Sequence, residues 1–184
     1  MLRDHNYGFI FSHAIAAVAL GTAFRPEDAS LKFWMLAALC AAMPDIDVIS
    51  FRFGMGHDPL LGHRGFTHSF VFAALLGGII VIGAFHHRQW DGLRTSLWLF
   101  FFLATASHGM LDGMTNGGRG VAFFAPFDNT RYFFPFRPIE VSPLGIGPFF
   151  SDRGLTVLTS EFIWIWLPAF LFAILALIGK RFFR

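Results

Sequence analysis

Five apolar runs divide the chain, at residues 8–24, 31–49, 70–85, 97–111 and 162–179. Most are near or below the roughly 17–25 residues that a membrane-spanning helix needs, and the last run fits best. Only 14% of the residues are charged whereas 55% are hydrophobic, and the mean hydropathy is +0.57. Soluble domains are about one quarter charged, so too few polar residues remain here to cover a soluble core. The runs predict an all-α, multi-pass membrane bundle of four to five apolar helices, forming one domain over residues 1–184.

One long loop interrupts this pattern between residues 113 and 159. It is rich in Gly, Pro and Phe, and it includes Asn116 followed by two glycines. So many aromatic side chains would not stay solvated, which argues against a flexible linker. Aromatic residues with arginines between them are typical of the membrane–water interface. We therefore expect this loop to lie at that interface, with membrane lipid as a partner.

The basic residues carry a weak signal about orientation and a clear one about partners. The net charge is +2 and the basic residues are scattered, so the clustered pattern of a nucleic-acid-binding protein is missing and no nucleic-acid partner is expected. With five spans, the Lys and Arg residues divide seven against seven between the two sides. Lys180, Arg181 and Arg184 lie next to a helix end, where basic residues mark the cytoplasmic side. We therefore expect a cytoplasmic C-terminus.

The ionisable residues of the apolar runs gather at one side of the predicted bundle. Helices that cross up and down alternately place the starts of odd runs and the ends of even runs at one membrane face. Eight residues meet this condition: His13, Asp45, Asp47, His63, His68, His108, Asp112 and Glu161. Ionisable groups inside or beside membrane helices are costly and usually functional. The chain therefore predicts a polar site at one face.

The stretch from His63 to Ser69 leads into the third run, and Thr67 or Ser69 can cap the helix that follows. His63 and His68 are five residues apart, which would separate them by about 140° on one helix. They can converge only if His63 lies on the incoming loop and His68 in the first helical turn. We therefore predict His68 as a metal ligand and give His63 a catalytic role, as ligand, hydrogen-bond partner or proton donor.

His108 and Asp112 are four residues apart in the fourth run. That spacing puts them about 40° apart on a helix face, where they form either a chelating pair or a plain hydrogen bond. Pro44 should end or kink the second helix and leave Asp45 and Asp47 on irregular backbone. Either aspartate could then orient or deprotonate a water molecule, and Asp47 is our catalytic candidate.

Imidazoles and carboxylates in this number suit a divalent metal, Zn²⁺ first and Mn²⁺ second. The predicted ligands are His13, Asp45, Asp47, His68, His108 and Asp112. This set exceeds what one tetrahedral ion requires, so we predict two ions with Asp112 bridging them. Such pairs of ions assist displacement at phosphorus and generate hydroxide at neutral pH.

Three motifs resemble the YdjM-like family of bacterial inner-membrane proteins, which are regarded as metal-dependent hydrolases. They are the segments 44–47 (Pro-Asp-Ile-Asp), 62–69 (Gly-His-Arg-Gly-Phe-Thr-His-Ser) and 107–112 (Ser-His-Gly-Met-Leu-Asp). The loop segments 115–118, 137–139 and 141–143 are similar to it as well. The resemblance spans from His13 to about Glu161, and it implies a bacterial cytoplasmic-membrane location and a hydrolytic activity.

More distantly, the order of these residues is similar to that of the zinc-dependent phospholipase C and single-strand nuclease group, an all-α fold with three zinc ions. That likeness implies His13, one of Asp45 or Asp47, His68, His108 and Asp112 as ligands. A later histidine cluster of that group is missing, because no histidine follows His108. At most two of the three ions are then implied, and phospholipase activity does not simply transfer.

Cationic and amide side chains are the candidates for substrate binding. Arg64, Asn116 and Arg137 are predicted to hold the substrate, while Arg131 is read as an anchor to lipid headgroups. We expect a membrane-bound, metal-dependent hydrolase that acts on a small-molecule or lipid-linked ester or phosphoester. The alternatives are a transporter that binds a cation and a membrane scaffold or regulatory protein stabilised by a metal.

Overall fold

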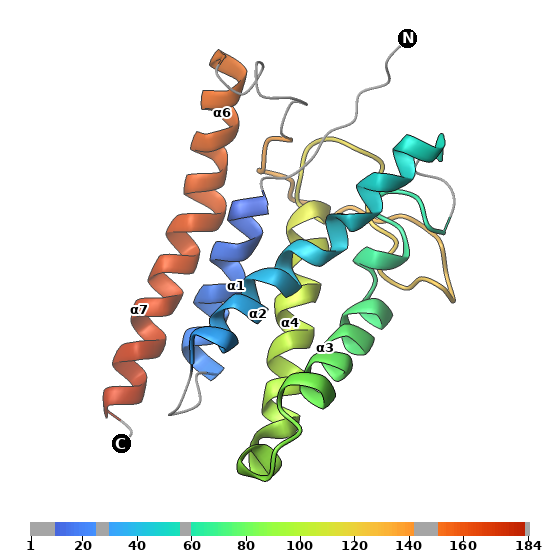
Figure 1. Cartoon of the computed structure of the whole chain (residues 1–184). Helices are drawn as coiled ribbons and strands as arrows, with labels where there is room; N and C mark the ends of the chain where they lie inside the picture. Colours follow the sequence, from blue (N-terminus) through green and yellow to red (C-terminus); the bar gives the residue numbers. More distant parts are fainter. Residues whose placement is uncertain (1–9, 25–29, 56–59, 142–150, 183–184) are drawn as a thin grey trace.

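The computed structural model describes residues 10–24, 30–55, 60–141 and 151–182 as a bundle of helices (Figure 1). Among these residues there is no strand, only the isolated bridges Thr115↔Ile139 and Val121↔Tyr132. The all-α prediction is confirmed. The helices are α1 (Ile10–Phe24), α2 (Leu31–Ala42), η1 (Met43–Phe53), η2 (Phe66–His68), α3 (Phe70–Ala84), η3 (Arg88–Leu93), α4 (Arg94–Gly113), α6 (Asp152–Glu161), η4 (Phe162–Trp166) and α7 (Leu167–Phe182).

Fewer helices are long and apolar enough to cross a membrane than the four to five apolar helices we expected. Two helical stretches of the described chain are long and apolar enough to cross a membrane, Leu31–Phe51 and Asp152–Phe182. Helices α1 and α3 have 15 residues each, about 22 Å at 1.5 Å per residue, which is less than the roughly 30 Å of a bilayer core. Helix α4 has 20 residues but carries the polar site residues near its end, so it is not apolar enough throughout.

The bundle is held together by a core of small and aromatic residues between α1, α2 and α4. Ala17, Ala37 and Ala104 are fully buried, and small side chains let membrane helices approach closely. The rings of Phe33 and Phe100 stack beside them, with centroids 4.8 Å apart. This packing holds α1, α2 and α4 side by side (Figure 1), and these helices and their continuations bear several of the predicted ligands.

The second apolar run changes its geometry where the sequence contains Pro44. Helix α2 ends at Ala42, and the chain continues as the 3₁₀ helix η1 with Pro44 in its first turn. A proline is tolerated in the first turn of a helix, because the N–H that it lacks would have no acceptor within that helix. Asp45 and Asp47 therefore lie on regular 3₁₀ backbone rather than on the irregular backbone we expected. At about 120° per residue, the two carboxylates leave this helix in different directions.

Helix α3 begins as the sequence suggested, with Ser69 as its cap: the Ser69 hydroxyl accepts from the N–H of Phe72 at 3.1 Å. The loop after α4 then covers this end of the bundle. The N–H of Phe70 donates to Phe123 O at 3.0 Å, and the two rings stack with centroids 5.3 Å apart. Residues 142–150 of the predicted loop lie outside the described residues, and α6 begins within it at Asp152.

The last helical stretch contains a wide turn, η4, between α6 and α7. Here the N–H of Leu167 bonds to Phe162 O, five residues back, as in a π-helical turn. Pro168 follows at once and cannot donate to the carbonyl of Trp164. The wide turn brings both Glu161 and Trp166 to Ser12 of α1, which ties α7 to the bundle: the Ser12 hydroxyl donates to Glu161 at 2.7 Å and accepts from the Trp166 indole at 2.8 Å.

Candidate metal centre

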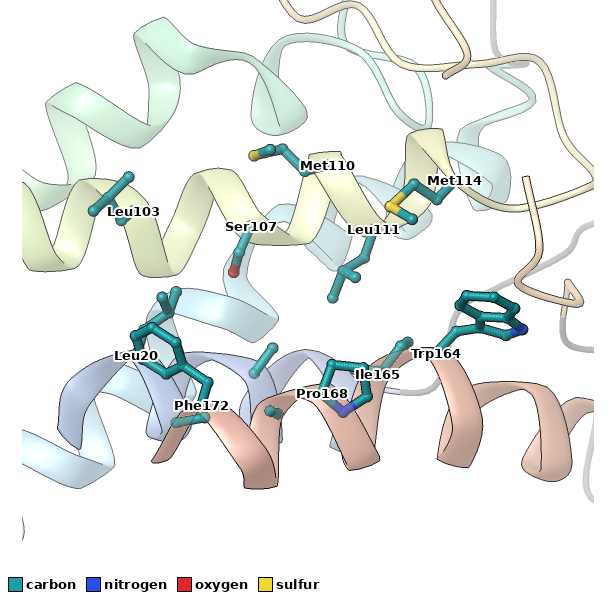
Figure 2. A pocket seen from close by; sticks show the side chains of 13 residues that line it. Leu20, Leu103, Ser107, Met110, Leu111, Met114, Trp164, Ile165, Pro168 and Phe172 are labelled. Atoms are coloured by element: carbon teal, nitrogen blue, oxygen red, sulfur yellow. The ribbon is translucent and has the colours of Figure 1, made fainter. Parts of the chain in front are cut away.

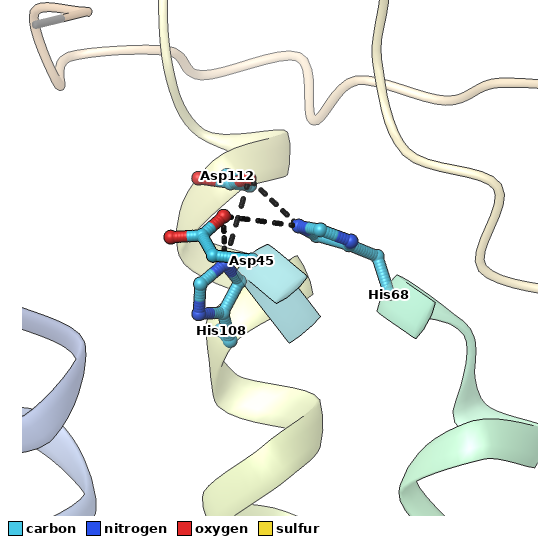
Figure 3. Close-up of side chains that lie close together, drawn as sticks. All are labelled: Asp45, His68, His108 and Asp112. Atoms are coloured by element: carbon cyan, nitrogen blue, oxygen red, sulfur yellow. Dashed lines mark ion pairs between the residues drawn. The ribbon is translucent and has the colours of Figure 1, made fainter. Parts of the chain in front are cut away.

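Four side chains from three helices converge at the end of the bundle where α4 ends (Figure 3). We call Asp45, His68, His108 and Asp112 the primary cluster. Each offers one ligand atom, and these four atoms all lie within 4.8 Å of one another. Asp45 Oδ1 is 3.2 Å from His108 Nε2, and Asp112 Oδ2 is 3.3 Å from His68 Nε2. This group could hold one metal ion.

The two imidazoles are oriented through their Nδ1 atoms. His108 Nδ1 lies 2.6 Å from the carbonyl oxygen of Ala41, which can only accept, so Nδ1 carries the proton. His68 Nδ1 lies 3.0 Å from Asp47 Oδ2. When the imidazoles are neutral, each Nε2 therefore presents a lone pair to the cluster, and both Nε2 atoms are buried without a hydrogen-bond partner. Metal-binding histidines are oriented in this way, by a carbonyl or carboxylate on the second nitrogen.

Asp47 is the most heavily bonded carboxylate of the site. Its Oδ1 accepts from His63 Nδ1 at 2.7 Å, and its Oδ2 accepts from Arg64 N at 3.0 Å and Thr67 Oγ1 at 2.5 Å. Together with His68, these contacts occupy both of its oxygens. Asp47 thus connects η1 to the 63–68 segment and fixes the two histidines. It also forms a second possible metal group with Asp45, His63 and His68.

The charges of the site favour a cation. Asp45, Asp47 and Asp112 are three nearly buried carboxylates beside one buried guanidinium, that of Arg64, which leaves about two negative charges when the imidazoles are neutral. Buried charge without compensation is costly, and one divalent ion would balance it. Burial alone would lower the pKa of His68, but Asp47, with Asp112 and Asp45, raises that pKa well above 6.5. The metal-free site therefore holds a proton where a metal would bind.

Arg64 is among the largest fully buried side chains and has a left-handed backbone, with φ 61°. Its Nε lies 3.0 Å from Asp112 Oδ2, and its Nη1 donates to Thr115 Oγ1 at 3.2 Å and Gly117 O at 3.1 Å. A Cβ on Gly118, whose φ is +83°, would lie 2.7 Å from Nη1. The guanidinium is thus held in a fitted cradle, and Nη2 is buried without a hydrogen-bond partner.

His13 approaches the primary cluster from α1. Its ring stacks on that of His108, with centroids 3.7 Å apart and an interplanar angle of 17°. Its Nε2 lies 3.8 Å from Asp112 Oδ1, the oxygen that faces away from the primary cluster's contacts. Asp112 therefore has one oxygen on each side, toward His68 and toward His13.

The other predicted substrate residues make their contacts within the loop. Asn116 Oδ1 accepts from Val141 N at 3.0 Å, and the guanidinium of Arg137 lies 4.7 Å from the centroid of the Phe133 ring. Both side chains are exposed. Arg131, expected at lipid headgroups, donates instead to His63 O at 3.0 Å and Arg64 O at 3.1 Å. Arg131 therefore holds the backbone at His63 and Arg64 in place.

Sequence reasoning missed several residues that shape the site. Gly109 allows α4 to approach η2, since a Cβ there would lie 2.7 Å from His68 O. Thr67 and Thr115 bond to Asp47 and Arg64. The signal was present in the sequence, because all three stand inside or beside the motifs that carry the ligands.

Comparison with known proteins agrees with this picture. The profile described as YdjM inner membrane protein matches residues 9–183. The inner membrane protein YbcI of Escherichia coli (strain K12) is 34% identical over 165 residues, which cover 88% of this chain and 92% of that protein. No solved structure gives a significant match. The chain belongs to the YdjM family of inner membrane proteins.

Proposed function

We propose that the chain is a metal-dependent hydrolase of the inner membrane that acts on esters or phosphoesters. One observation carries this proposal: two buried imidazole Nε2 atoms without hydrogen-bond partners face two carboxylates. Such a donor set matches Zn²⁺, which binds nitrogen and carboxylate ligands in a tetrahedron. Mn²⁺ is the second choice, since it also accepts imidazole and carboxylate ligands.

When bound, Zn²⁺ supplies activation of water and polarisation of a carbonyl or phosphoryl oxygen. The residues of the chain provide the rest. Asp47 holds His63 by a 2.7 Å hydrogen bond, as a carboxylate orients the imidazole of a general base. We assign proton transfer to His63. Arg64 has its unpartnered Nη2 available for an anionic oxygen of the substrate.

The number of ions follows from how the ligands can be shared. His68 cannot serve the primary cluster and the second metal group through the same Nε2, and both Asp47 oxygens already accept hydrogen bonds. The remaining position lies between Asp112 Oδ1 and His13 Nε2, which are 3.8 Å apart. We therefore propose that the primary cluster would hold one zinc ion and that His13 and the second oxygen of Asp112 would hold another ion more weakly.

A metal-stabilised scaffold is the second candidate function. The primary cluster offers four protein ligands, and a shell closed by four ligands is typical of structural zinc. A cation transporter has less support, since the candidate metal ligands gather at one end of the bundle instead of along its helices. The C-terminal Lys180 and Arg181 end α7, so we place the C-terminus in the cytoplasm and the site at the opposite face.

The experiment is metal analysis and a phosphodiester assay on the detergent-purified protein. We expect about one to two zinc ions per chain and cleavage of bis(p-nitrophenyl) phosphate, both lost in His108→Ala. The matched control is His87→Ala, an exposed histidine after α3, which should keep both. Stoichiometric zinc without hydrolysis of ester or phosphodiester probes would favour the scaffold. Unchanged zinc in His108→Ala would refute the metal centre.

A further inference from the structure

A groove of about 350 Å³ lies between α1, α4 and the η4–α7 helix (Figure 2). Its lining is apolar except for Ser107, whose hydroxyl donates to Ala104 O at 2.9 Å within its own helix. Figure 2 shows Leu103, Leu20 and Phe172 toward one end and Met114 with Trp164 toward the other. We propose that this groove binds one acyl chain of a lipid substrate whose ester or phosphoester lies at the primary cluster. This inference rests on the proposed hydrolase function.

The groove lies beside the metal centre along α1 and α4 and runs away from it. Ser107 and Leu111 of its wall directly precede His108 and Asp112 on α4. On α1, Ala16 lies one helical turn after His13, on nearly the same face. The groove then continues along both helices to Leu20 and Leu103, toward the middle of the apolar runs. A molecule with a polar head and a long apolar tail matches this arrangement of a charged site and an apolar channel.

The lining chemistry selects an aliphatic chain over a polar ligand. A bound polar group would lose its hydration and find no hydrogen-bond partner among these side chains. Met110 and Met114 are flexible, polarisable side chains that adapt to an irregular ligand. The helical stretch Asp152–Phe182 is long and apolar enough to cross a bilayer, and only 6% of its apolar window is buried inside the protein, so the groove beside it is open to a chain from the lipid phase.

A second apolar groove provides an internal comparison. It lies between α1 and the same η4–α7 helix, and it is lined by residues that include Phe11, Val18 and Ala173. No residue of α4 lines it, so it does not lead to His108 and Asp112. It is similarly apolar and of similar size, at about 420 Å³. Ordinary membrane lipid should enter both grooves alike, whereas a substrate chain should prefer the groove that lies beside the site on α4.

The binding test uses nanodiscs of phosphatidylethanolamine and phosphatidylglycerol that contain phosphatidylethanolamine with a diazirine on one acyl chain. We expect the photo-crosslinks of wild-type protein to map to α4 near Met110 and to α7 near Phe172. Ala16→Trp should reduce them at least about fivefold, because the indole fills the groove. Ala173→Trp, which fills the second groove, should leave them unchanged. Equal crosslinking in Ala16→Trp and wild type would overturn the inference.

The activity test separates this inference from the proposed function. With long-chain phospholipid, Ala16→Trp should lose at least about tenfold in rate, while bis(p-nitrophenyl) phosphate should be cleaved as by wild type. Loss of both activities at unchanged zinc content would refute a groove specific to acyl chains. If Ala16→Trp loses zinc and is therefore misfolded, Leu103→Trp at the far end of the groove replaces it. Hydrolysis of neither substrate by wild type would refute the proposed function, and crosslinking would still decide whether the groove binds a chain.

Discussion

Replacing Asp47 by Asn tests whether this carboxylate orients His68 or binds the metal directly. The substitution keeps the shape of the side chain and turns one acceptor oxygen into an NH₂ donor. That donor would face groups that themselves donate, from His63, Arg64, Thr67 and His68 at 2.5–3.0 Å. Hydrogen bonds to a charged group contribute about 1.5–3 kcal/mol each, so His68 would lose part of its fixed orientation.

The expected magnitude follows from the place of Asp47 behind the ligand. Removing a partner that orients a metal-binding histidine lowers metal affinity about 10–100-fold, or about 1.4–2.8 kcal/mol. Asp45→Asn removes a carboxylate that lies 3.2 Å from His108 Nε2 inside the primary cluster, and it should abolish stoichiometric zinc. The two neighbouring aspartates should therefore differ clearly in the same experiment.

The assay is a zinc titration of detergent-purified protein against a fluorescent chelator of known affinity. The control is Asp91→Asn, because Asp91 pairs with Arg94 at 2.7 Å and its side chain is 58% exposed. That variant should bind zinc as wild type does. Wild-type affinity in Asp47→Asn would refute the orienting role. A loss as complete as that of Asp45→Asn would make Asp47 a direct ligand.

Two further perturbations test the electrostatics and the arginine cradle. The raised pKa of His68 stabilises the metal-free fold fully below pH 6.5, and this contribution is lost as the pH rises through the raised pKa. Zinc must displace that proton, so the gap in Tm between zinc-loaded and chelator-treated protein should widen as the pH increases above 6.5; a constant or shrinking gap would contradict it. Gly118→Ala, at φ +83° and against Arg64, should lower stability by about 1–2 kcal/mol from backbone strain alone and reduce phosphodiester cleavage. Gly92→Ala, with open space around its Cβ position, is its control, and equal effects of the two would refute the cradle.

Much of the helical pattern could be predicted because hydropathy is a local property. The run at 70–85 became α3, which ends at Ala84, and Ser69 caps it, since a hydroxyl before an apolar run has few other roles. The geometry of the second run could not be predicted fully. Pro44 marked the change in helix geometry at Met43. The continuation of this run as a long 3₁₀ helix depends on the contacts of Asp45 and Asp47 with segments far along the chain.

The site residues were recognisable from their types and spacing, but the separate role of each residue was not. Asp45 and Asp47 were both predicted as metal ligands, with Asp47 also as the catalytic candidate, whereas their different directions from η1 give them different partners. Arg64 stays a candidate for substrate binding, and its ion pair with Asp112 became visible only in the fold. Asn116 and Arg137 stand near motif residues in sequence, yet the loop turns them to its own surface contacts.

The sequence by itself determined that this chain forms apolar helices with histidines and aspartates at their ends, because hydrophobicity and i, i+4 spacing act over a few residues. Only the tertiary structure decided which atoms of those side chains face one another. His108 presents Nε2 to the cluster because its Nδ1 meets the carbonyl of Ala41, 67 residues away. Contacts between segments so distant arise from packing of whole helices, and no local pattern specifies them.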